Sequence, residues 1–342
     1  MNIALKGRYV GPEYPTFIIA EACDNHLGNM DVAREMVRQA KVAGADAIKF
    51  QHHLPDEEML RDAPMSDNFK EPLYEFLKKY ALTLEQHRQL RRHCDEANIL
   101  YLCTPFSWKA AQEIEPLVPA FKIGSGEMTD VPTLVRISQF GKPMIVSTGM
   151  STFAEIDRTY EALSKRGVPV ALMNCVSEYP PVYEDLNLGV ICKMRDRYPQ
   201  AVIGHSDHTA DLFTCFAAVA LGARIIEKHV ILDKQQPGPD QSVSISFCEL
   251  AELVEGIRKV EVGLGNEKRV HQREQSIRTW AFRSIVTTRP IRKGELITQD
   301  DIWSKRPGTG IPAHQMEEVL GCRAKRDIET NVLLAWEDLE RS

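Results

Sequence analysis

The 342-residue sequence contains no hydrophobic run that approaches the roughly 20 apolar residues needed to cross a bilayer. Residues 1–8 lack the apolar core and cleavage site of a signal peptide. Basic residues are not in excess either, because 42 lysines and arginines against 48 aspartates and glutamates give a net charge of −6. A net-acidic surface attracts neither nucleic acid nor an anionic membrane. We therefore expect a cytoplasmic protein with no nucleic-acid or membrane partner.

The eight cysteines show no Cys-x-x-Cys spacing. Most lie within apolar stretches, which is typical of reduced core thiols rather than of a disulfide framework. Hydrophobic residues make up 43% of the chain and charged residues 26%, the ordinary balance of a globular protein. A chain of this length buries a full core without disulfides.

Eight short apolar runs recur in the first 265 residues, and a segment of helical periodicity follows each run. The runs are residues 17–22, 47–51, 99–104, 120–123, 144–147, 170–175, 202–206 and 224–230. This alternation predicts an α/β fold with a parallel sheet, and eight units predict a closed (β/α)8 TIM barrel over residues 1–265. A doubly wound open sheet is the alternative. We expect Asp31 to cap the helix after the first strand.

The pattern changes after residue 265. Residues 266–281 are charged and poorly periodic, and we interpret them as a linker. The remaining segment, 282–342, contains an internal repeat. The residues from Ile291 onward match those from Ile328 onward. Each copy predicts a turn, a short strand and a short helical turn. The tail is therefore predicted to be a small β-rich domain with pseudo-symmetry.

Polar residues occur at the C-terminal end of nearly every predicted strand. In a (β/α)8 barrel the catalytic side chains come from these ends and from the loops that follow them. The polar residues are Glu21, Lys49, Gln51, Thr104, Lys122, Glu127, Ser147, Asn174, Tyr179, Ser206, His208, Glu227 and His229. Structural strand ends do not require charged groups at nearly every position, so the whole set favours an enzyme.

His208 and His229 are the candidate metal ligands, because they follow neighbouring strands at the same end of the predicted sheet. Together with nearby carboxylates, two histidines suit a partly hydrated divalent ion such as Mn²⁺, Mg²⁺ or Co²⁺. Two loop histidines that are hydrogen-bonded within the protein are the competing interpretation. The histidines expected at the surface are His87, His93, His271 and His314.

Lys49 and Lys122 are charged groups within apolar strands, where an unpaired ammonium is costly. One interpretation is a Schiff-base lysine of a class I aldolase. Another is a pair of cations that holds a phosphorylated, carboxylated substrate. The turns at 124–126 and 147–149 and the hydroxyl of Thr104 favour the second, because backbone N–H groups and hydroxyls form an anion cradle. Lysines that extend their ammonium groups into solvent are the structural alternative.

Several motifs occur in one register. They are Phe17-Ile-Ile-Ala-Glu-Ala-x-x-Asn-His-x-Gly, Gly44-Ala-Asp-Ala-Ile-Lys-Phe-Gln, Phe121-Lys-Ile-Gly-Ser-Gly-Glu, Ser147-Thr-Gly-Met, Gly204-His-Ser-Asp-His-Thr, Glu227-Lys-His, Pro237-Gly-Pro-Asp and Lys305-Arg-Pro-Gly-Thr-Gly-Ile-Pro. With these motifs the sequence resembles the N-acetylneuraminate (sialic acid) synthase family over nearly its whole length. The tail resembles the antifreeze-like (SAF) domain of the bacterial members.

This resemblance implies a transferase that condenses phosphoenolpyruvate with an N-acylated, N-acetylmannosamine-type sugar. The products would be a nine-carbon 3-deoxy-2-keto acid and phosphate, released by cleavage of the bridging C–O bond. His208 and His229 would ligate a divalent metal ion, Mn²⁺ before Mg²⁺ or Co²⁺, that polarises the sugar aldehyde. Related synthases act on 2,4-diacetamido-2,4,6-trideoxymannose to make legionaminic or pseudaminic acid. Residues 51–59 and 73–75 resemble the sialic and legionaminic enzymes more than the pseudaminic ones.

The resemblance also implies roles for individual residues. The implied catalytic residues are Glu21, Lys49, Gln51 and Lys122, with Glu21 and Gln51 around the metal ion. The implied phosphoenolpyruvate-binding residues are Lys49, Thr104, Lys122, Ser125, Ser147, Ser177 and Ser206. The implied sugar-binding residues are Asn68, Glu127, Tyr179, Asp240, Phe282 and Arg306. Since the last two lie in the tail, which in bacterial members reaches the other subunit, the resemblance implies a domain-swapped homodimer.

Ser177, His205 and residues 22–24 depart from the family pattern and border the expected substrates. They bear on the choice of sugar more than on the reaction. Two interpretations outside the family remain. One is an aldolase or lyase with a Schiff base on Lys49 or Lys122, and the other is a non-catalytic carbohydrate- or ice-binding protein, suggested only by the tail.

Overall fold

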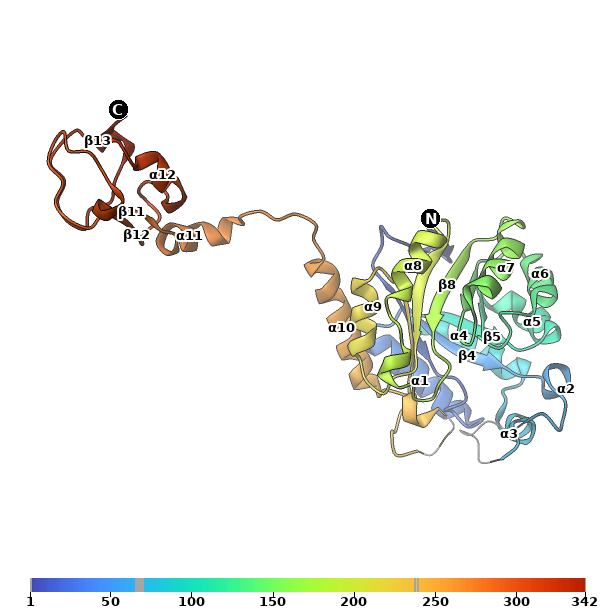
Figure 1. Cartoon of the computed structure of the whole chain (residues 1–342). Coiled ribbons are helices and arrows are strands. Elements are labelled where there is room, and N and C mark those ends of the chain that lie inside the picture. Colours follow the sequence, from blue (N-terminus) through green and yellow to red (C-terminus); the bar gives the residue numbers. More distant parts are fainter. Residues whose placement is uncertain (1, 65–70, 237, 239, 342) are drawn as a thin grey trace. The chain divides into compact units, whose positions relative to one another are not determined.

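The computed structural model describes residues 2–64, 71–236, 238 and 240–341. The chain divides into two compact units, Met1–Gly265 and Asn266–Ser342 (Figure 1). No helix in the described ranges is long and apolar enough to span a membrane. All eight cysteines are free.

The first unit is built on eight parallel strands in the order β5-β4-β3-β10-β9-β8-β7-β6. The strands are β3 (Phe17–Glu21), β4 (Ala47–His52), β5 (Leu100–Pro105), β6 (Phe121–Ile123), β7 (Met144–Ser147), β8 (Val170–Cys175), β9 (Val202–Asp207) and β10 (Ile225–His229). The first strand of the barrel, β3, pairs with the last, β10. The strands at the two ends of the order, β5 and β6, also lie side by side. The predicted (β/α)8 barrel is therefore confirmed, and the open doubly wound sheet is excluded.

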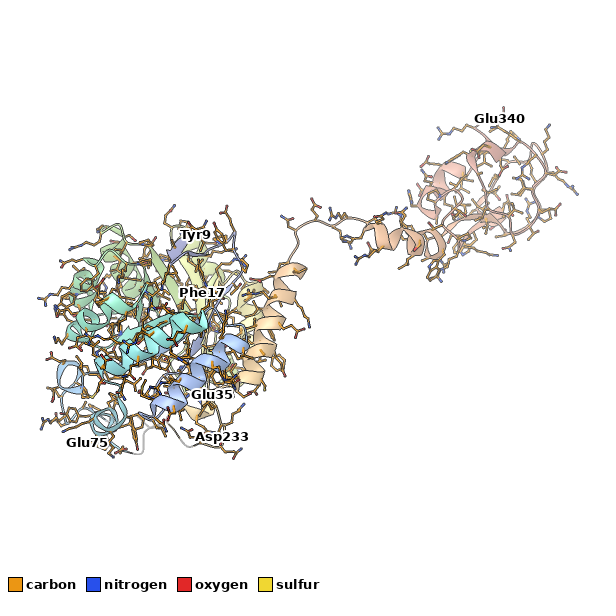
Figure 2. The ribbon with its side chains drawn as sticks, turned by 180° about the vertical axis from the view of Figure 1, so that it is seen from behind. Tyr9, Phe17, Glu35, Glu75, Asp233 and Glu340 are labelled. Atoms are coloured by element: carbon orange, nitrogen blue, oxygen red, sulfur yellow. The ribbon has the colours of Figure 1, made fainter. Side chains whose placement is uncertain are left out.

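Helices cover the outside of this barrel (Figure 1). They are α1 (Met30–Val42), α4 (Leu84–Ala97), α5 (Trp108–Ile114), α6 (Val131–Ser138), α7 (Phe153–Ser164), α8 (Val190–Arg197), α9 (Phe213–Ala220) and α10 (Phe247–Gly263). Two shorter helices, α2 (Pro55–Glu58) and α3 (Leu73–Tyr80), lie after the C-terminal end of β4 instead, and Leu73 and Leu77 of α3 line the cavity described below. In α1 the residues spaced three and four apart, such as Ala33, Met36 and Ala40, are buried. Glu35 lies on the polar face of this helix (Figure 2). It forms an ion pair with Arg38.

Two local predictions for this helical layer are wrong. Asn29, and not Asp31, caps α1, because the Asn29 side chain accepts a hydrogen bond of 2.9 Å from the Asp31 backbone N–H. His87 is buried in α4 rather than exposed, since its Nδ1 forms a hydrogen bond of 2.7 Å with the Tyr101 hydroxyl.

The two-residue periodicity of the strands divides the core into two layers. Outward-facing residues such as Ile18, Ile48 and Phe50 pack against the helices. The inner layer fills the N-terminal half of the barrel with Phe17, Ile19, Ala47, Leu100, Leu102, Ala120, Ile145, Ala171, Met173, Val202 and Ile225. A hairpin of β1 (Ile3–Leu5) and β2 (Arg8–Val10) packs apolar side chains onto this inner layer.

The polar ring lies directly above the inner apolar layer. Two residues beyond an inward-facing apolar residue, seven of the eight strands present a polar group or a thiol: Ile19 is followed by Glu21 and Ala47 by Lys49. The same spacing relates Leu102 to Thr104, Ala120 to Lys122, Ile145 to Ser147, Met173 to Cys175 and Ile225 to Glu227. Because every strand runs in the same direction, these groups gather at one end of the barrel.

The second unit contains short elements around an isoleucine-rich core. They are α11 (Gln275–Ala281), β11 (Ser284–Thr287), β12 (Ile302–Lys305), α12 (Met316–Val319), β13 (Arg323–Ala324) and β14 (Leu339–Glu340). Ile291 and Ile328, the first residues of the two sequence copies, exchange backbone hydrogen bonds of 2.8 Å in each direction. The small β-rich tail is confirmed. The segment interpreted as a linker, 266–281, includes α11.

A buried ion pair joins β9 to β10 outside the barrel interior. Lys228 Nζ lies 2.7 Å from Asp207 Oδ1, and both side chains are fully buried. Burial acts to raise the pKa of Asp207, but His205 and Lys228 outweigh it and hold this pKa well below its usual value. Since Asp207 precedes His208 and Lys228 precedes His229, the pair links the strands at the two candidate metal ligands.

We expect Lys228→Met to lower the free energy of unfolding by about 3 kcal/mol, because the buried Asp207 carboxylate loses its cation. Urea unfolding of the whole chain measures this loss. The matched control is Lys259→Met, which breaks an exposed ion pair with Glu255 on α10 and should leave stability nearly unchanged. Similar losses in both variants would contradict a structural role for the buried pair.

Candidate active site

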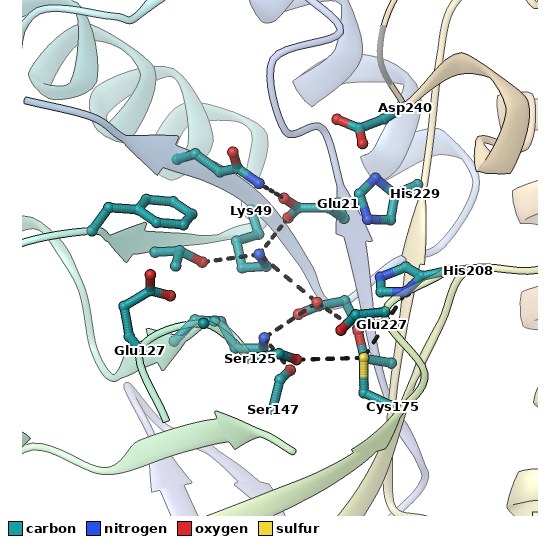
Figure 3. Close-up of a pocket in the computed structure, with 18 of the residues that line it drawn as sticks. Glu21, Lys49, Ser125, Glu127, Ser147, Cys175, His208, Glu227, His229 and Asp240 are labelled. Carbon is teal, nitrogen blue, oxygen red and sulfur yellow. Dashed lines mark hydrogen bonds and ion pairs between the residues drawn. The ribbon is translucent and has the colours of Figure 1, made fainter. Parts of the chain in front are cut away.

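A cavity of about 360 Å³ opens at the C-terminal end of the barrel strands. Most of the predicted site residues line it (Figure 3). They are Glu21, Lys49, Gln51, Thr104, Lys122, Ser125, Glu127, Ser147, Ser177, Tyr179, Ser206, His208, His229 and Asp240. The barrel thus brings together side chains that are up to about 220 residues apart in sequence.

Two lysines and two glutamates form a buried charged group in the cavity (Figure 3). Lys49 Nζ lies 2.7 Å from Glu21 Oε2 and 3.8 Å from Glu227 Oε1. Lys122 Nζ lies 3.4 Å from the same Glu227 oxygen. The four side chains are nearly inaccessible to solvent, so each charge depends on the others for stabilisation.

Hydroxyl groups complete the surroundings of the two lysines. Lys49 donates a hydrogen bond of 3.0 Å to Thr104 Oγ1, and Lys122 donates one of 2.7 Å to Ser147 Oγ. Ser206 Oγ donates to Glu227 Oε1 over 3.0 Å. These contacts fix the ammonium groups in place before any ligand arrives.

The pKa values of the two lysines shift in opposite directions. Burial acts to lower the pKa of Lys49, but Glu21 and Glu227 outweigh it and raise this pKa to about 12. Burial lowers the pKa of Lys122, and Glu227 offsets this only in part. A Schiff-base lysine must lose its proton to attack a carbonyl. The environment of Lys49 therefore favours a permanent cation over a nucleophile.

A chain of hydrogen bonds holds the Glu21 carboxylate. Gln51 Nε2 donates to Glu21 Oε1 over 3.0 Å, and Gln51 Oε1 lies 3.0 Å from His53 Nε2. His53 Nδ1 in turn lies 3.0 Å from Glu58 Oε1. Burial raises the pKa of Glu21 to about 7, although Lys49 acts to lower it.

Two serines, Ser125 and Ser177, come together at one wall of the cavity because Gly149 has no side chain. The Gly149 backbone N–H donates to Ser125 Oγ over 3.1 Å. A Cβ atom at Gly149 would lie 2.2 Å from Ser177 Oγ and 2.7 Å from Ser125 Oγ. Serine hydroxyls beside the Lys122 ammonium are donors that suit phosphate or carboxylate oxygens.

His208 and His229 lie close together in the cavity, with their ring centroids 5.2 Å apart. His208 Nδ1 donates to the Val176 carbonyl over 2.7 Å, and its Nε2 lies 3.1 Å from the Tyr179 hydroxyl. Burial, followed by the neighbouring His208, lowers the pKa of His229 well below its usual value. A neutral imidazole is the form that ligates a metal ion.

These residues fit a divalent metal ion. His229 Nδ1 is buried and has no hydrogen-bond partner among the described residues. The Asp240 carboxylate lines the same part of the cavity. Two imidazoles beside a carboxylate form a donor set that Mn²⁺, Co²⁺ or Zn²⁺ accepts.

The end of the cavity near Glu127 is rich in carboxylates. Burial raises the pKa of Glu127 to about 7 and that of Asp24 to about 6. Buried oxygens of both groups lack hydrogen-bond partners within the described chain. Glu127 Oε2 occupies the space beside Gly124, where a Cβ atom would lie only 2.4 Å away. Hydroxyl and N–H donors of a ligand would satisfy these oxygens.

The sequence analysis did not assign three residues that line the cavity, namely Asp24, His53 and Cys175. The sequence does contain a pattern that points to His53. It lies two residues after Gln51, which lies two residues after Lys49, so the alternation of the strand predicts that its side chain points into the barrel. Cys175 Sγ lies 3.9 Å from His208 Nδ1. Burial acts to raise the pKa of Cys175, but His208 outweighs it and lowers this pKa to about 7.

The predicted sugar-binding residues also include Asn68, Phe282 and Arg306. Asn68 is outside the described residues. Phe282 lines a cavity within the second unit. The Arg306 guanidinium lies 5.1 Å from the centroid of the Trp280 ring. The roles of these three residues stay predictions.

The fold and the site define a (β/α)8 barrel of enzyme type followed by a small β-rich domain. Residues 36–269 match the model of the NeuB family, and residues 282–340 match that of the SAF domain. The chain therefore belongs to the NeuB family.

Individual relatives agree with this assignment. The chain is 34% identical to the N,N'-diacetyllegionaminic acid synthase of Campylobacter jejuni, over 93% of this chain and 98% of the relative. It is also 34% identical to the N-acetylneuraminate-9-phosphate synthase of Homo sapiens, over 94% and 92%. The crystal structure of the N-acetylneuraminic acid synthetase of Leptospira borgpetersenii superposes with a TM-score of 0.73 at 31% identity, covering 81% of this chain and 95% of that one.

We expect Glu127→Gln to stabilise the chain at pH 8 by about 1–2 kcal/mol, a value reduced because the side chain is partly exposed. The folded carboxyl keeps its proton to about pH 7, whereas the unfolded one loses it near 4.5. The wild type therefore loses stability as the pH rises through this window, and glutamine does not. Unfolding at pH 8 and pH 5 measures the difference, which should shrink at the lower pH.

The exposed substitution Glu57→Gln on α2 is the control for this experiment. It should leave the pH dependence of stability unchanged, because the side chain is solvated in both states. Equal stability of the wild type and Glu127→Gln at pH 8 would contradict the burial of this carboxyl.

Proposed function

We propose that this chain is a transferase that condenses phosphoenolpyruvate with an N-acetylmannosamine-type sugar. The products are a nine-carbon 3-deoxy-2-keto acid and inorganic phosphate. One observation carries the proposal: a cavity that holds two buried lysines and several hydroxyls on one side and two neighbouring histidines on the other. The first set suits an anionic donor, and the second set suits a metal ion beside the acceptor.

Lys49 and Lys122 hold the carboxylate and phosphate of phosphoenolpyruvate in this proposal. Their ammonium groups face the same part of the cavity and are already neutralised by Glu21 and Glu227. Thr104, Ser125, Ser147, Ser177 and Ser206 add hydroxyl donors around them. An incoming phosphate then meets fixed donors that need little reorganisation.

His208 and His229 would hold a divalent metal ion, for which Mn²⁺ is the first expectation. When bound, such an ion polarises the carbonyl oxygen of the open-chain sugar as a Lewis acid. Glu127, Tyr179 and Asp240 offer acceptors and a hydroxyl to the sugar. Tyr179 and Asp240 lie beside the histidines, whereas Glu127 lies at the other end of the cavity (Figure 3).

The reaction forms one C–C bond and breaks one C–O bond. Carbon 3 of phosphoenolpyruvate attacks the aldehyde carbon, and the aldehyde oxygen takes a proton to become a hydroxyl. Water adds to the electron-poor carbon 2 and gives up a proton to a carboxylate of the buried charged group. The tetrahedral intermediate then releases phosphate with its bridging oxygen, which leaves the 2-keto group.

The acceptor has a second candidate, 2,4-diacetamido-2,4,6-trideoxymannose. The chain has the same 34% identity to the legionaminic acid synthase of C. jejuni as to the human N-acetylneuraminate-9-phosphate synthase. A homodimer in which the SAF domain of one subunit supplies Phe282 and Arg306 to the other is part of the proposal.

Phosphate release tests the reaction directly. With phosphoenolpyruvate and Mn²⁺, we expect release only when N-acetylmannosamine or 2,4-diacetamido-2,4,6-trideoxymannose is present, and EDTA should abolish it. The sugar with the higher kcat/KM identifies the product. No release with either sugar, from folded and metal-loaded protein, would refute the proposed reaction.

We expect His229→Ala and His208→Ala each to lower kcat at least about 100-fold, because each would remove one of two imidazole ligands. Metal retained after gel filtration should fall in parallel, while the thermal unfolding midpoint of the metal-free protein stays close to that of the wild type. The exposed His314→Ala in the second unit is the control. Near-normal turnover in either site variant would show that the ligand assignment is wrong.

A further inference from the structure

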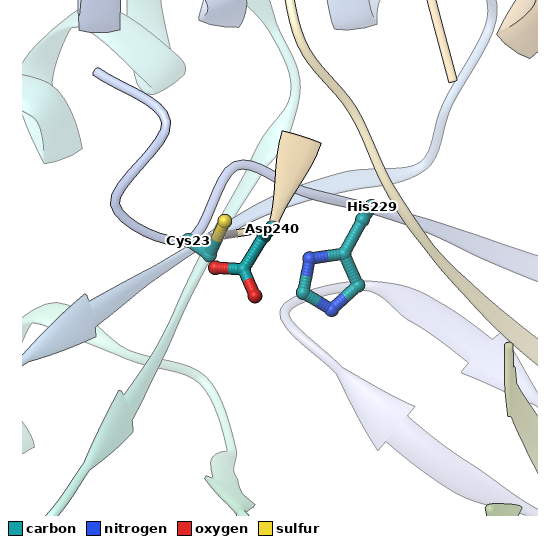
Figure 4. A group of neighbouring side chains, drawn as sticks. All are labelled: Cys23, His229 and Asp240. Atoms are coloured by element: carbon teal, nitrogen blue, oxygen red, sulfur yellow. The ribbon is translucent and has the colours of Figure 1, made fainter. Parts of the chain in front are cut away.

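Three side chains of different chemistry meet at the edge of the cavity. Cys23 Sγ, a ring nitrogen of His229 and a carboxylate oxygen of Asp240 all lie within 4.8 Å of one another (Figure 4). They come from distant parts of the sequence: Cys23 follows β3, His229 ends β10, and Asp240 lies in the loop before α10. Sulfur, nitrogen and oxygen donors at this separation can converge on one ion after small side-chain rotations.

The histidine of this cluster has free capacity for a ligand. His229 is 4% exposed, and its Nδ1 has no hydrogen-bond partner in the described chain. Cys23 is fully buried, and the Asp240 carboxylate is its polar neighbour. Asp240 and His229 both line the cavity, so an ion entering from solvent reaches them first.

The thiol occupies an unusual backbone position. Cys23 has a φ of +38°, in the left-handed region that favours glycine. The turn places the residue two positions after Glu21, which pairs in register with His229 across β3 and β10. A cysteine therefore occupies a backbone position that suits glycine. Its side chain lies beside the His229 imidazole and the Asp240 carboxylate.

We propose that Cys23 is a thiolate ligand of the metal ion, together with His229 and Asp240. On binding, the ion displaces the thiol proton to solvent and forms a metal–sulfur bond. Thiolate is a soft donor, whereas Mn²⁺ and Mg²⁺ prefer oxygen. This ligand set consequently selects Zn²⁺ or Co²⁺ over Mn²⁺, which changes the expected identity of the ion in this chain.

The inference rests on the metal site of the proposed function, since His229 belongs to both. Its test uses binding rather than turnover, so the two can fail separately. Phosphate release without a metal–sulfur bond would overturn only the role of Cys23. A metal–sulfur bond without phosphate release would overturn only the proposed reaction.

The experiment is a Co²⁺ titration of the metal-free whole chain, followed by absorption. We expect the wild type to show the visible bands of bound Co²⁺ and a near-ultraviolet thiolate-to-cobalt charge-transfer band. Cys23→Ser should lose the charge-transfer band, although its hydroxyl can still hydrogen-bond to Asp240. Cys23→Gly should lose it too, and glycine suits the left-handed turn, so this variant keeps the fold.

Competition between metals gives a second readout. Zn²⁺ affinity should fall at least about tenfold in Cys23→Ser, while Mn²⁺ affinity should change much less. The exposed Cys248→Ser is the matched control and should keep both the band and the affinity.

Two results would overturn the proposal. The first is a charge-transfer band that persists in Cys23→Ser and Cys23→Gly, and its loss in Cys175→Ser would then assign the sulfur ligand to Cys175. The second is bound Co²⁺ in the wild type with visible bands and no charge-transfer band.

Discussion

The buried pairing of Lys49 and Lys122 with Glu21 and Glu227 is the constraint on which the site depends. An ammonium group inside a barrel is costly unless a carboxylate lies within a few ångströms. The parallel register meets this need, because Glu21 lies opposite Lys49 on β3 and β4, and Glu227 lies between the two lysines. The pairing register of the strands must therefore be maintained for the four buried charges to stay paired.

The same arrangement explains how a buried site can receive an anion. With two cations and two anions, the group is balanced when all four are ionised, and it holds its geometry without a ligand. A bound phosphate or carboxylate would upset this balance unless a carboxyl takes up a proton. Glu21, whose burial raises its pKa to about 7, is suited to that adjustment. Binding of the anion and protonation of a neighbouring carboxyl are thus coupled by electrostatics.

Much of this site was predictable from the sequence, because two simple regularities determine it. Strand periodicity places Lys49, Lys122 and Ser147 inside the barrel, and the parallel direction places them at one end. Side chains that depend on a partner across a loop or helix carry no such pattern. Buried His87 is hydrogen-bonded to the Tyr101 hydroxyl, which no periodicity predicts. Asn29 instead of Asp31 caps α1 through one local hydrogen bond.

The Cys23, His229 and Asp240 cluster belongs to the part that sequence patterns do not reveal. Cys23 is separated from His229 and Asp240 by about 200 residues and meets them only because β3 and β10 are neighbours in the closed barrel. In sequence, Cys23 is one of several cysteines within an apolar stretch. In the closed barrel Cys23 lies beside His229, a candidate metal ligand. The buried His229 Nδ1 has no hydrogen-bond partner among the described residues, so it is available to bind an ion together with the Cys23 thiolate. Barrel closure therefore determines which donor atoms can share one ion, and through them which metals the site prefers.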